Sequence, residues 1–268
     1  MDSGAVSIRQ HIRQSLSKFP LAPHLGRQNY PTMNLTAASI VADLRALGDP
    51  TKAAHAQGFF KTGPDEYGEG DKFLGIRVPD QRKFARTYKD LPLSETTKLL
   101  ISEWHEARLT ALFILVGQYR KGDDETREAI YRLYVGHTDY VNNWDLVDSS
   151  AHFIVGPHLA PDERGLLDNL ALSESLWERR ISMIATYHYI KQDQFADALR
   201  IAELLVNDYH DLIHKAVGWM LREIGKRSME AEEAFLKKHY RTMPRTMLRY
   251  AIEKFPEALR RAYIEGRV

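Results

Sequence analysis

The chain has 268 residues, of which 44% are hydrophobic, and its formal net charge is +1. This length and apolar content are enough for a sizeable core, in one large domain or two small ones. The complete absence of cysteine excludes disulfides, thiolate nucleophiles and cysteine-based metal sites. It is consistent with a reducing cytoplasm, where we expect the protein to act as a monomer.

The sequence shows no membrane-spanning segment, and its N-terminal residues differ in composition from the rest of the chain. The longest apolar run, 109–116, is well short of the roughly 18 residues that a membrane-spanning helix needs, so we expect no contact with a membrane. Residues 1–32 are rich in proline, serine and arginine and predict a flexible N-terminal extension, although Met33 is an alternative start of the chain. Residues 33–268 form the predicted functional domain.

Helical periodicity begins at 36–47, where Ile40, Val41, Leu44 and Leu47 form one apolar stripe. The further predicted helices span, in chain order, 93–104, 106–119, 126–134, 144–153, 161–172, 176–190, 195–205, 211–224, 231–240, 245–255 and 256–264. Alternating strand patterns do not recur. About a dozen helices, spaced at roughly 35–40 residues per pair, predict an all-α fold, an α-solenoid of HEAT-like or armadillo-type repeats with a concave face.

Common catalytic motifs are incomplete in this sequence. His105 and Glu106 begin a zinc-protease motif, but Leu109 stands where the second histidine is required. A phosphate-binding loop and a serine nucleophile elbow are also absent. We therefore expect neither a metal nor an organic cofactor.

The first unusual cluster surrounds Trp144. Asn143 is a good helix N-cap, and Trp144 and Asp148 then lie four residues apart on one face of the predicted helix. Asp145 lies in the first turn, where the helix dipole favours a negative charge, so we interpret it as structural. Asp148 lies one turn further on and is a candidate functional carboxylate, with a structural salt bridge as the alternative.

A second cluster combines tryptophan with basic residues. Lys215, Trp219 and Arg222 share a helix face, an arrangement suited to phosphate and sugar, although a core tryptophan between solvated cations would give the same spacing. From Lys215 to the C-terminus, 13 lysines and arginines face seven glutamates and no aspartate. This local excess fits nucleic-acid binding or an ordinary solvated helical surface.

Five clusters together resemble the AlkD family of bacterial DNA alkylation-repair glycosylases. They are, in order, FLGIRVP (73–79), NWDLVD (143–148), WERR (177–180), KAVGWMLRE (215–223) and RTMLRYAIE (245–253). The resemblance extends from about Met33 to the C-terminus. It implies HEAT-like repeats that hold duplex DNA on a concave basic face. It also implies excision of positively charged N3- and N7-alkylated purines in base excision repair, without flipping of the base.

The resemblance also implies roles for individual residues. Trp144 and Trp219 would pack against the deoxyribose of the lesion, and Asp148 would be the catalytic carboxylate. Arg180, or the adjacent Arg179, would match the arginine near the site. The other expected DNA-binding residues are Lys215, Arg222, Arg245 and Arg249. No cofactor is implied.

Two other functions remain open at this stage. A non-catalytic DNA-binding paralogue, which recognises branched or damaged DNA, would share the scaffold without the catalytic residues. A helical-repeat scaffold for protein partners would fit the small net charge. The presence of Trp144, Asp148 and Trp219 favours the glycosylase.

Overall fold

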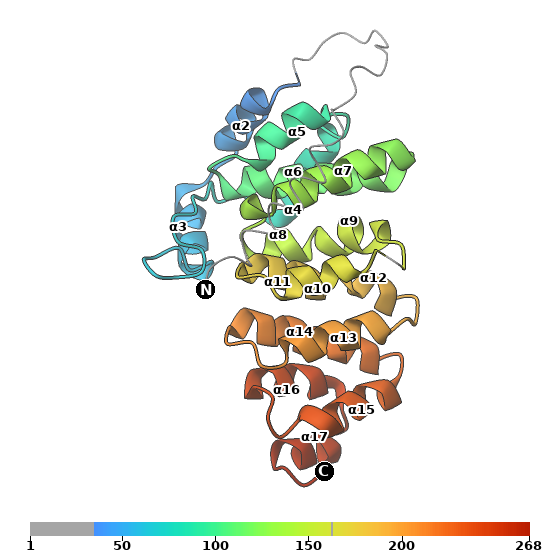
Figure 1. Ribbon diagram of the computed structural model, residues 1–268. Helices are drawn as coiled ribbons and strands as arrows, with labels where there is room; N and C mark the ends of the chain where they lie inside the picture. Colours follow the sequence, from blue (N-terminus) through green and yellow to red (C-terminus); the bar gives the residue numbers. More distant parts are fainter. Residues whose placement is uncertain (1–34, 162) are drawn as a thin grey trace, which may run out of the picture. The chain divides into compact units, whose positions relative to one another are not determined.

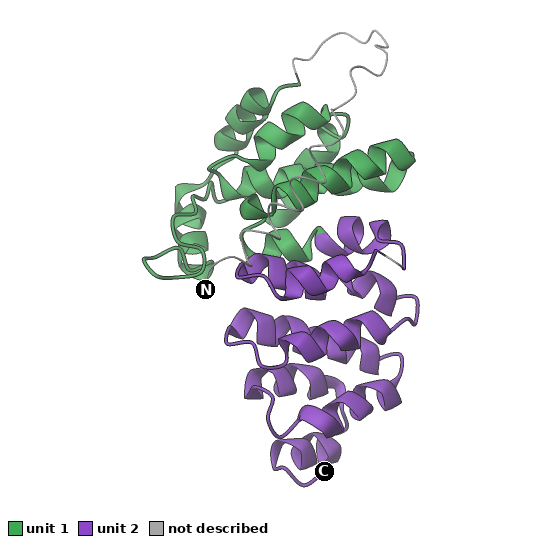
Figure 2. Ribbon diagram, in the orientation of Figure 1, with its two compact units in different colours: residues 1–150 green, residues 151–268 purple. Residues whose placement is uncertain are grey.

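The computed structural model describes residues 35–161 and 163–268. The chain divides into two compact units, Met1–Ser150 and Ala151–Val268 (Figure 2). Helices are the regular elements of the described residues, with one isolated bridge between Lys72 and Trp104. The prediction of an all-α protein is therefore confirmed, and the packing of successive helices within each unit is consistent with an α-solenoid repeat (Figure 1). The predicted extension, 1–32, lies outside the described residues, and none of the described helices is long and apolar enough to cross a membrane.

Unit 1 is organised around one long central helix. Its described elements are α2 (Ala37–Ala46), α3 (Pro50–Phe59), α4 (Val78–Thr87), α5 (Leu93–Leu100), α6 (His105–Lys121), α7 (Asp124–Gly136), η1 (Thr138–Tyr140) and α8 (Trp144–Asp148). Helices α4, α5 and α7 all pack against α6, and most α6 side chains are buried. This helix therefore forms the core against which α8 is placed.

Helices α3 and α4 were not among the predicted elements, because neither carries an apolar stripe. Among the described residues α3 buries none of its side chains, and α4 buries only Gln81 and Ala85. Their starts are fixed instead by local chemistry: the carboxylate of Asp49 accepts from two backbone N–H groups of α3, and Pro79 lies in the first turn of α4.

Unit 2 consists of stacked helices with α14 between α11 and α16. Its elements are α9 (Ala151–His158), α10 (Gly165–Ala171), α11 (Leu176–Ala185), α12 (Tyr187–Ile190), α13 (Ala196–Leu205), α14 (Asp211–Gly225), α15 (Met229–His239), α16 (Arg245–Ala251), η2 (Ile252–Lys254) and α17 (Glu257–Ile264). A Cβ at Gly218 would lie 2.5 Å from the Met247 carbonyl oxygen. Glycine at this position therefore allows α14 and α16 to pack closely.

The helix predicted over 144–153 is interrupted. The hydroxyl of Ser150 donates to the carbonyl of Leu146 at 2.6 Å, and the Ser150 N–H bonds to Val147 instead. A side chain thus takes the acceptor that the next helical N–H would have used, and the helix ends at Asp148. The helix predicted over 176–190 is likewise divided at Thr186, whose hydroxyl donates to the Met183 carbonyl.

Candidate active site

Helix α8 presents Trp144 and Asp148 together. Asn143 starts the helix, with its side-chain oxygen accepting from the N–H of Trp144 at 2.8 Å. The three residues between the pair, Asp145 to Val147, are buried, whereas Trp144 and Asp148 are only half-buried. The four-residue spacing therefore places the two side chains on the accessible side of α8, as the sequence pattern predicted.

Beneath Asp148 lies a buried tyrosine. The hydroxyl of Tyr134, on α7, is 2.9 Å from the hydroxyl of Ser150. Burial raises the pKa of Tyr134, and the negative charge of Asp148 raises it further. The carboxylate thus lies close to a neutral, fully buried hydroxyl group, and one side of Asp148 faces protein rather than water.

A column of aromatic rings supports Trp144. The ring of Phe60 stacks on Trp144 with centroids 5.2 Å apart, and Phe73 stacks on Phe60 at 5.0 Å. The imidazole of His105 lies against Phe73 at 4.4 Å. Phe59 meets the Trp144 ring edge-on at 5.9 Å and is 58% exposed. Sequence reasoning missed this column, and the adjacent phenylalanines at 59 and 60 were the available signal.

The loop that carries Phe73 is held by a buried carboxylate. Glu106 accepts from the N–H groups of Leu74 and Gly75, each at 2.8 Å, and of Ile76 at 3.3 Å. Gly75 has φ +81°, and a Cβ there would lie 2.2 Å from the Asp49 carbonyl oxygen. Only glycine fits this position, which explains physically the glycine of the FLGIRVP cluster.

A buried charged network joins α8 to α6. Nε2 of His105 lies 2.9 Å from Asp145, Nδ1 lies 3.1 Å from Asp71, and Arg108 donates to Asp71 at 2.5 Å. Burial opposes protonation of His105, but the two carboxylates outweigh it and raise its pKa to about 9. Asp145 is structural, as expected, but its main partner is a protonated histidine on another helix, which sequence spacing alone could not identify.

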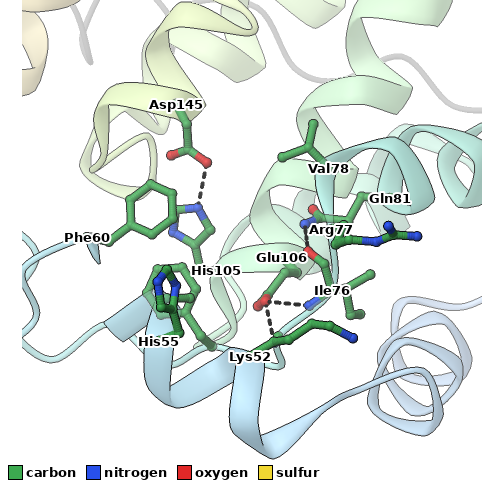
Figure 3. A pocket seen from close by; sticks show the side chains of 13 residues that line it. Lys52, His55, Phe60, Ile76, Arg77, Val78, Gln81, His105, Glu106 and Asp145 are labelled. Carbon is green, nitrogen blue, oxygen red and sulfur yellow. Dashed lines mark hydrogen bonds and ion pairs between the residues drawn. The ribbon is translucent and has the colours of Figure 1, made fainter. Parts of the chain in front are cut away.

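A cavity of about 250 Å³ opens beside this network (Figure 3). Phe60 and His105 line it together with Asp145, and Lys52, His55 and Arg77 bring basic groups to its rim. In the close-up, the imidazole of His105 lies beside the ring of Phe60 and is hydrogen-bonded to Asp145, and Glu106 reaches the backbone near Ile76. Phe60 thus both lines this cavity and stacks on Trp144.

Trp219 belongs to unit 2. It is half-buried on α14, its indole N–H donates to Glu223 at 3.0 Å, and its ring lies 6.0 Å from that of Tyr187. The three residues predicted to be catalytic are therefore divided, with Trp144 and Asp148 in unit 1 and Trp219 in unit 2. Their joint action on one substrate stays a prediction.

The two neighbouring arginines of α11 are both buried. Arg179 donates to Asp208 at 2.7 Å and to the carbonyls of Ser173 and Glu174. Arg180 donates to the Leu212 carbonyl at 2.5 Å. Arg179 thus ties the turn before α14 to α11, and Arg180 ties the first turn of α14 to α11; a DNA contact by either one stays a prediction.

The other predicted DNA-binding residues are more accessible. Lys215 pairs with Asp211 at 2.7 Å, and Arg222 pairs with Glu253. Arg245 is exposed and donates to the Ile264 carbonyl at 2.8 Å. Arg249 is exposed and makes no ion pair with any described residue, so its charge is directly available to a ligand.

Metal chemistry has no obvious ligand set in this part of the protein. Within residues 35–161 and 163–268, no group of three or more histidine, cysteine, aspartate or glutamate side chains is arranged to hold a metal ion. The titratable cluster of unit 1, at Asp71, His105 and Asp145, is instead closed by mutual hydrogen bonds and by Arg108.

Comparison with known proteins relates this chain to DNA repair. A family model described as "DNA alkylation repair enzyme" matches residues 40–255, well over half of the chain. Among solved structures, a predicted DNA alkylation repair enzyme from Enterococcus faecalis is similar with a TM-score of 0.60 and 17% identity. The similarity covers 78% of this chain and 97% of that one, and at this identity it supports the fold alone. No curated protein sequence matches the chain.

Proposed function

The chain belongs to the DNA alkylation repair enzyme family, and on that premise we propose that it is a DNA glycosylase for alkylated purines. Its substrates would be positively charged N3- and N7-alkylated purines, such as 3-methyladenine and 7-methylguanine, in duplex DNA. The observation that carries the proposal is the pairing of Trp144 with Asp148 on the accessible side of α8, with the Trp144 ring stacked on Phe60.

The proposed chemistry needs little from the protein beyond a fixed negative charge. An N7-alkylated guanine already carries a positive charge and leaves without a general acid. As the bond to the sugar breaks, positive charge develops at C1′, as in glycoside hydrolysis. A carboxylate about 4 Å away, at an effective dielectric constant of about 20, stabilises that charge by about 4 kcal/mol, which corresponds to roughly a thousandfold in rate.

In this proposal Asp148 supplies the charge and orients the attacking water. Its position beside the buried Tyr134 limits the solvent that screens it. Trp144 and Trp219 offer indole faces to the deoxyribose, and each face attracts a cationic sugar by about 1–2 kcal/mol. The base then has no need of a pocket of its own, in keeping with excision without flipping.

The basic residues of unit 2 would hold the DNA backbone. Lys215, Arg222, Arg245 and Arg249 lie on α14 and α16, which pack against each other. Phosphate contacts of this kind position the duplex and carry no sequence information. A cytoplasmic location and a monomeric state stay predictions from the sequence.

Release of 7-methylguanine from methylated duplex DNA tests the proposal directly. We expect the purified protein to release the base and Asp148→Asn to lower the rate about tenfold or more, with DNA affinity nearly unchanged. Asp124→Asn is the charge-matched control, because Asp124 is fully exposed at the start of α7, and it should behave as wild type. DNA binding without base release by the wild type would instead identify a non-catalytic DNA-binding protein.

A further inference from the structure

A second, larger cavity of unit 1 lies away from α8. Its volume is about 730 Å³, and it is formed by α4, the turn that leads to α5, and the C-terminal half of α6. Five basic side chains line it, Arg82, Arg86, Lys89, Arg120 and Lys121, against the single carboxylate of Asp90. We call this cavity the basic groove.

Three of the positive charges of the basic groove have no carboxylate partner in the described part of the chain. Arg86, Lys89 and Lys121 are exposed, and none of them pairs with a carboxylate of the described residues. Partial burial lowers the pKa of Arg82, and repulsion by Arg120 and Arg86 lowers it further. Such repulsion destabilises the folded protein unless an anion is bound.

Several cations elsewhere in unit 1 are matched with carboxylates. Arg77 pairs with Asp80 at 3.0 Å and Lys98 with Glu95 at 2.6 Å. The buried Arg108 pairs with Asp71. The gathering of Arg86, Lys89 and Lys121 in one groove therefore contrasts with these paired cations.

Two contacts preorganise the groove. The guanidinium of Arg82 lies over the ring of Phe113 at 4.1 Å, which holds its plane while its edges remain free to donate. The amide of Gln118 donates to the carbonyls of Lys89 and Leu91, at 2.9 and 2.8 Å. The turn that carries Lys89 is therefore fixed to α6, and little order must be gained when a ligand binds.

The chemistry of the walls favours a phosphodiester over an acidic protein. Protein interfaces normally add a buried aromatic or aliphatic anchor to their charges. In the described part of the chain, none of the large apolar side chains that are exposed lines this groove. The apolar side chains that do line it, such as Leu93 and Phe113, are half-buried, and Phe113 is covered by Arg82. Surface cations arranged in this way are typical of sites that contact the nucleic-acid backbone, where affinity comes from phosphate neutralisation.

We propose that the basic groove binds the phosphodiester backbone of DNA as a contact site separate from α8. The proposal rests on the proposed function only in taking duplex DNA as the ligand. The groove lies in unit 1, whereas the basic residues predicted from the sequence all lie in unit 2. Unit 1 then makes phosphate contacts of its own.

The salt dependence of DNA binding tests this assignment. The probe is a short, undamaged, fluorescein-labelled duplex, with affinity measured between about 50 and 200 mM NaCl. The groove variant is Arg86→Ala with Lys89→Ala. The control is Lys237→Ala with Lys238→Ala on α15, which removes the same charge from side chains already paired with Glu233 and Glu203.

We expect the groove variant to bind roughly tenfold more weakly at low salt, with the slope of log affinity against log salt reduced by about 2. The control should keep the wild-type slope. A groove variant with wild-type affinity and slope overturns the proposal. The charge-retaining variant, Arg86→Lys with Lys89→Arg, should restore the slope, which separates lost charge from impaired folding. Because the probe is undamaged, the result is independent of whether the wild type releases bases.

Discussion

The indole ring of Trp144 lies on the ring of Phe60 with centroids 5.2 Å apart and planes inclined by 23°. The two side chains come from different helical segments, so the stack fixes the direction in which α8 presents its tryptophan. Phe73 and His105 continue the column into the interior of unit 1. The orientation of Trp144 therefore depends on residues that are not themselves expected to touch DNA.

Phe60→Leu should lower the rate of base release several-fold, because Trp144 loses the face that holds it. The effect is expected in the rate at saturating DNA more than in the affinity. Phe84→Leu is the matched control, since Phe84 contacts Tyr88 on α4 and lies outside the column. Single-turnover base release and DNA affinity should be measured for both variants. If Phe60→Leu and Phe84→Leu release the base at the same rate, Phe60 does not have this role.

The His105 network predicts a pH-dependent stability. The pKa of His105 is raised to about 9 in the folded protein, so the protonated ring stabilises the fold fully below its unfolded pKa of about 6.5. That contribution, on the order of 2–3 kcal/mol, is lost as the pH rises towards 9. Asp145→Asn should therefore lower the free energy of unfolding near pH 6. Near pH 9 the difference in this free energy between the variant and the wild type should be smaller.

Urea unfolding at about pH 6 and about pH 9 checks this expectation. Asp65→Asn is the control, because Asp65 is exposed, and its positive φ of 60° is tolerated by asparagine. If Asp145→Asn loses the same stability at both pH values, the histidine is not the source of the effect.

The sequence predicted helices well where they bury many apolar side chains, and poorly where they bury few. Helix α14 was predicted almost to its ends because Ile213, Val217, Leu221 and Ile224 form a buried stripe. Helices α3 and α4 bury too few apolar side chains to leave such a pattern. The break after Asp148 depends on the Ser150 hydroxyl, whose choice of acceptor no periodicity contains.

The candidate site was also predictable only in part. The sequence predicted that Trp144 and Asp148 share a helix face, because residues i and i+4 lie on the same side of a helix. Their support was not predicted, because Phe60 and His105 reach α8 from other segments of the chain. Arg179 and Arg180 were treated as alternatives for one site arginine; both are buried, and each donates hydrogen bonds within unit 2. The sequence could not distinguish these two arginines, because their hydrogen-bond partners Asp208 and Leu212 are distant in sequence.

The buried Glu232 of α15 should also make the stability of the protein depend on pH. Burial, assisted by the nearby Glu233, raises its pKa to about 8, while Arg222 opposes the shift. A carboxyl group with a raised folded pKa destabilises the fold progressively as the pH rises from about 4.5 to 8, because only the unfolded state ionises freely.

Glu232→Gln should therefore gain stability relative to wild type between about pH 6 and pH 9, by an amount on the order of 2 kcal/mol. Chemical unfolding at both pH values measures the difference. Glu230→Gln, an exposed residue of the same helix, should show none. A constant difference for Glu232→Gln would mean that this carboxyl group is already ionised at neutral pH.

Substitution of Arg179 and of Arg249 should have different effects, the first on the stability of unit 2 and the second on DNA binding. Arg179→Ala leaves Asp208 as a buried, unpaired charge, which costs about 3 kcal/mol or more and should lower the Tm clearly. Arg249→Ala removes an exposed, unpaired cation, so the Tm should stay within experimental error. If Arg249 contacts a phosphate, its variant should bind duplex DNA several-fold more weakly, with a salt slope lower by about 1.

Thermal unfolding and a salt series of DNA binding, applied to both variants, distinguish these roles. The contrast is informative because both residues were expected to bind DNA, and only their burial and partners separate them. Arg179→Lys should recover only part of the lost stability, since a single ammonium cannot reproduce the bonds to Asp208, Ser173 and Glu174. An Arg179→Ala variant with wild-type Tm and weakened DNA binding would reverse the assignment.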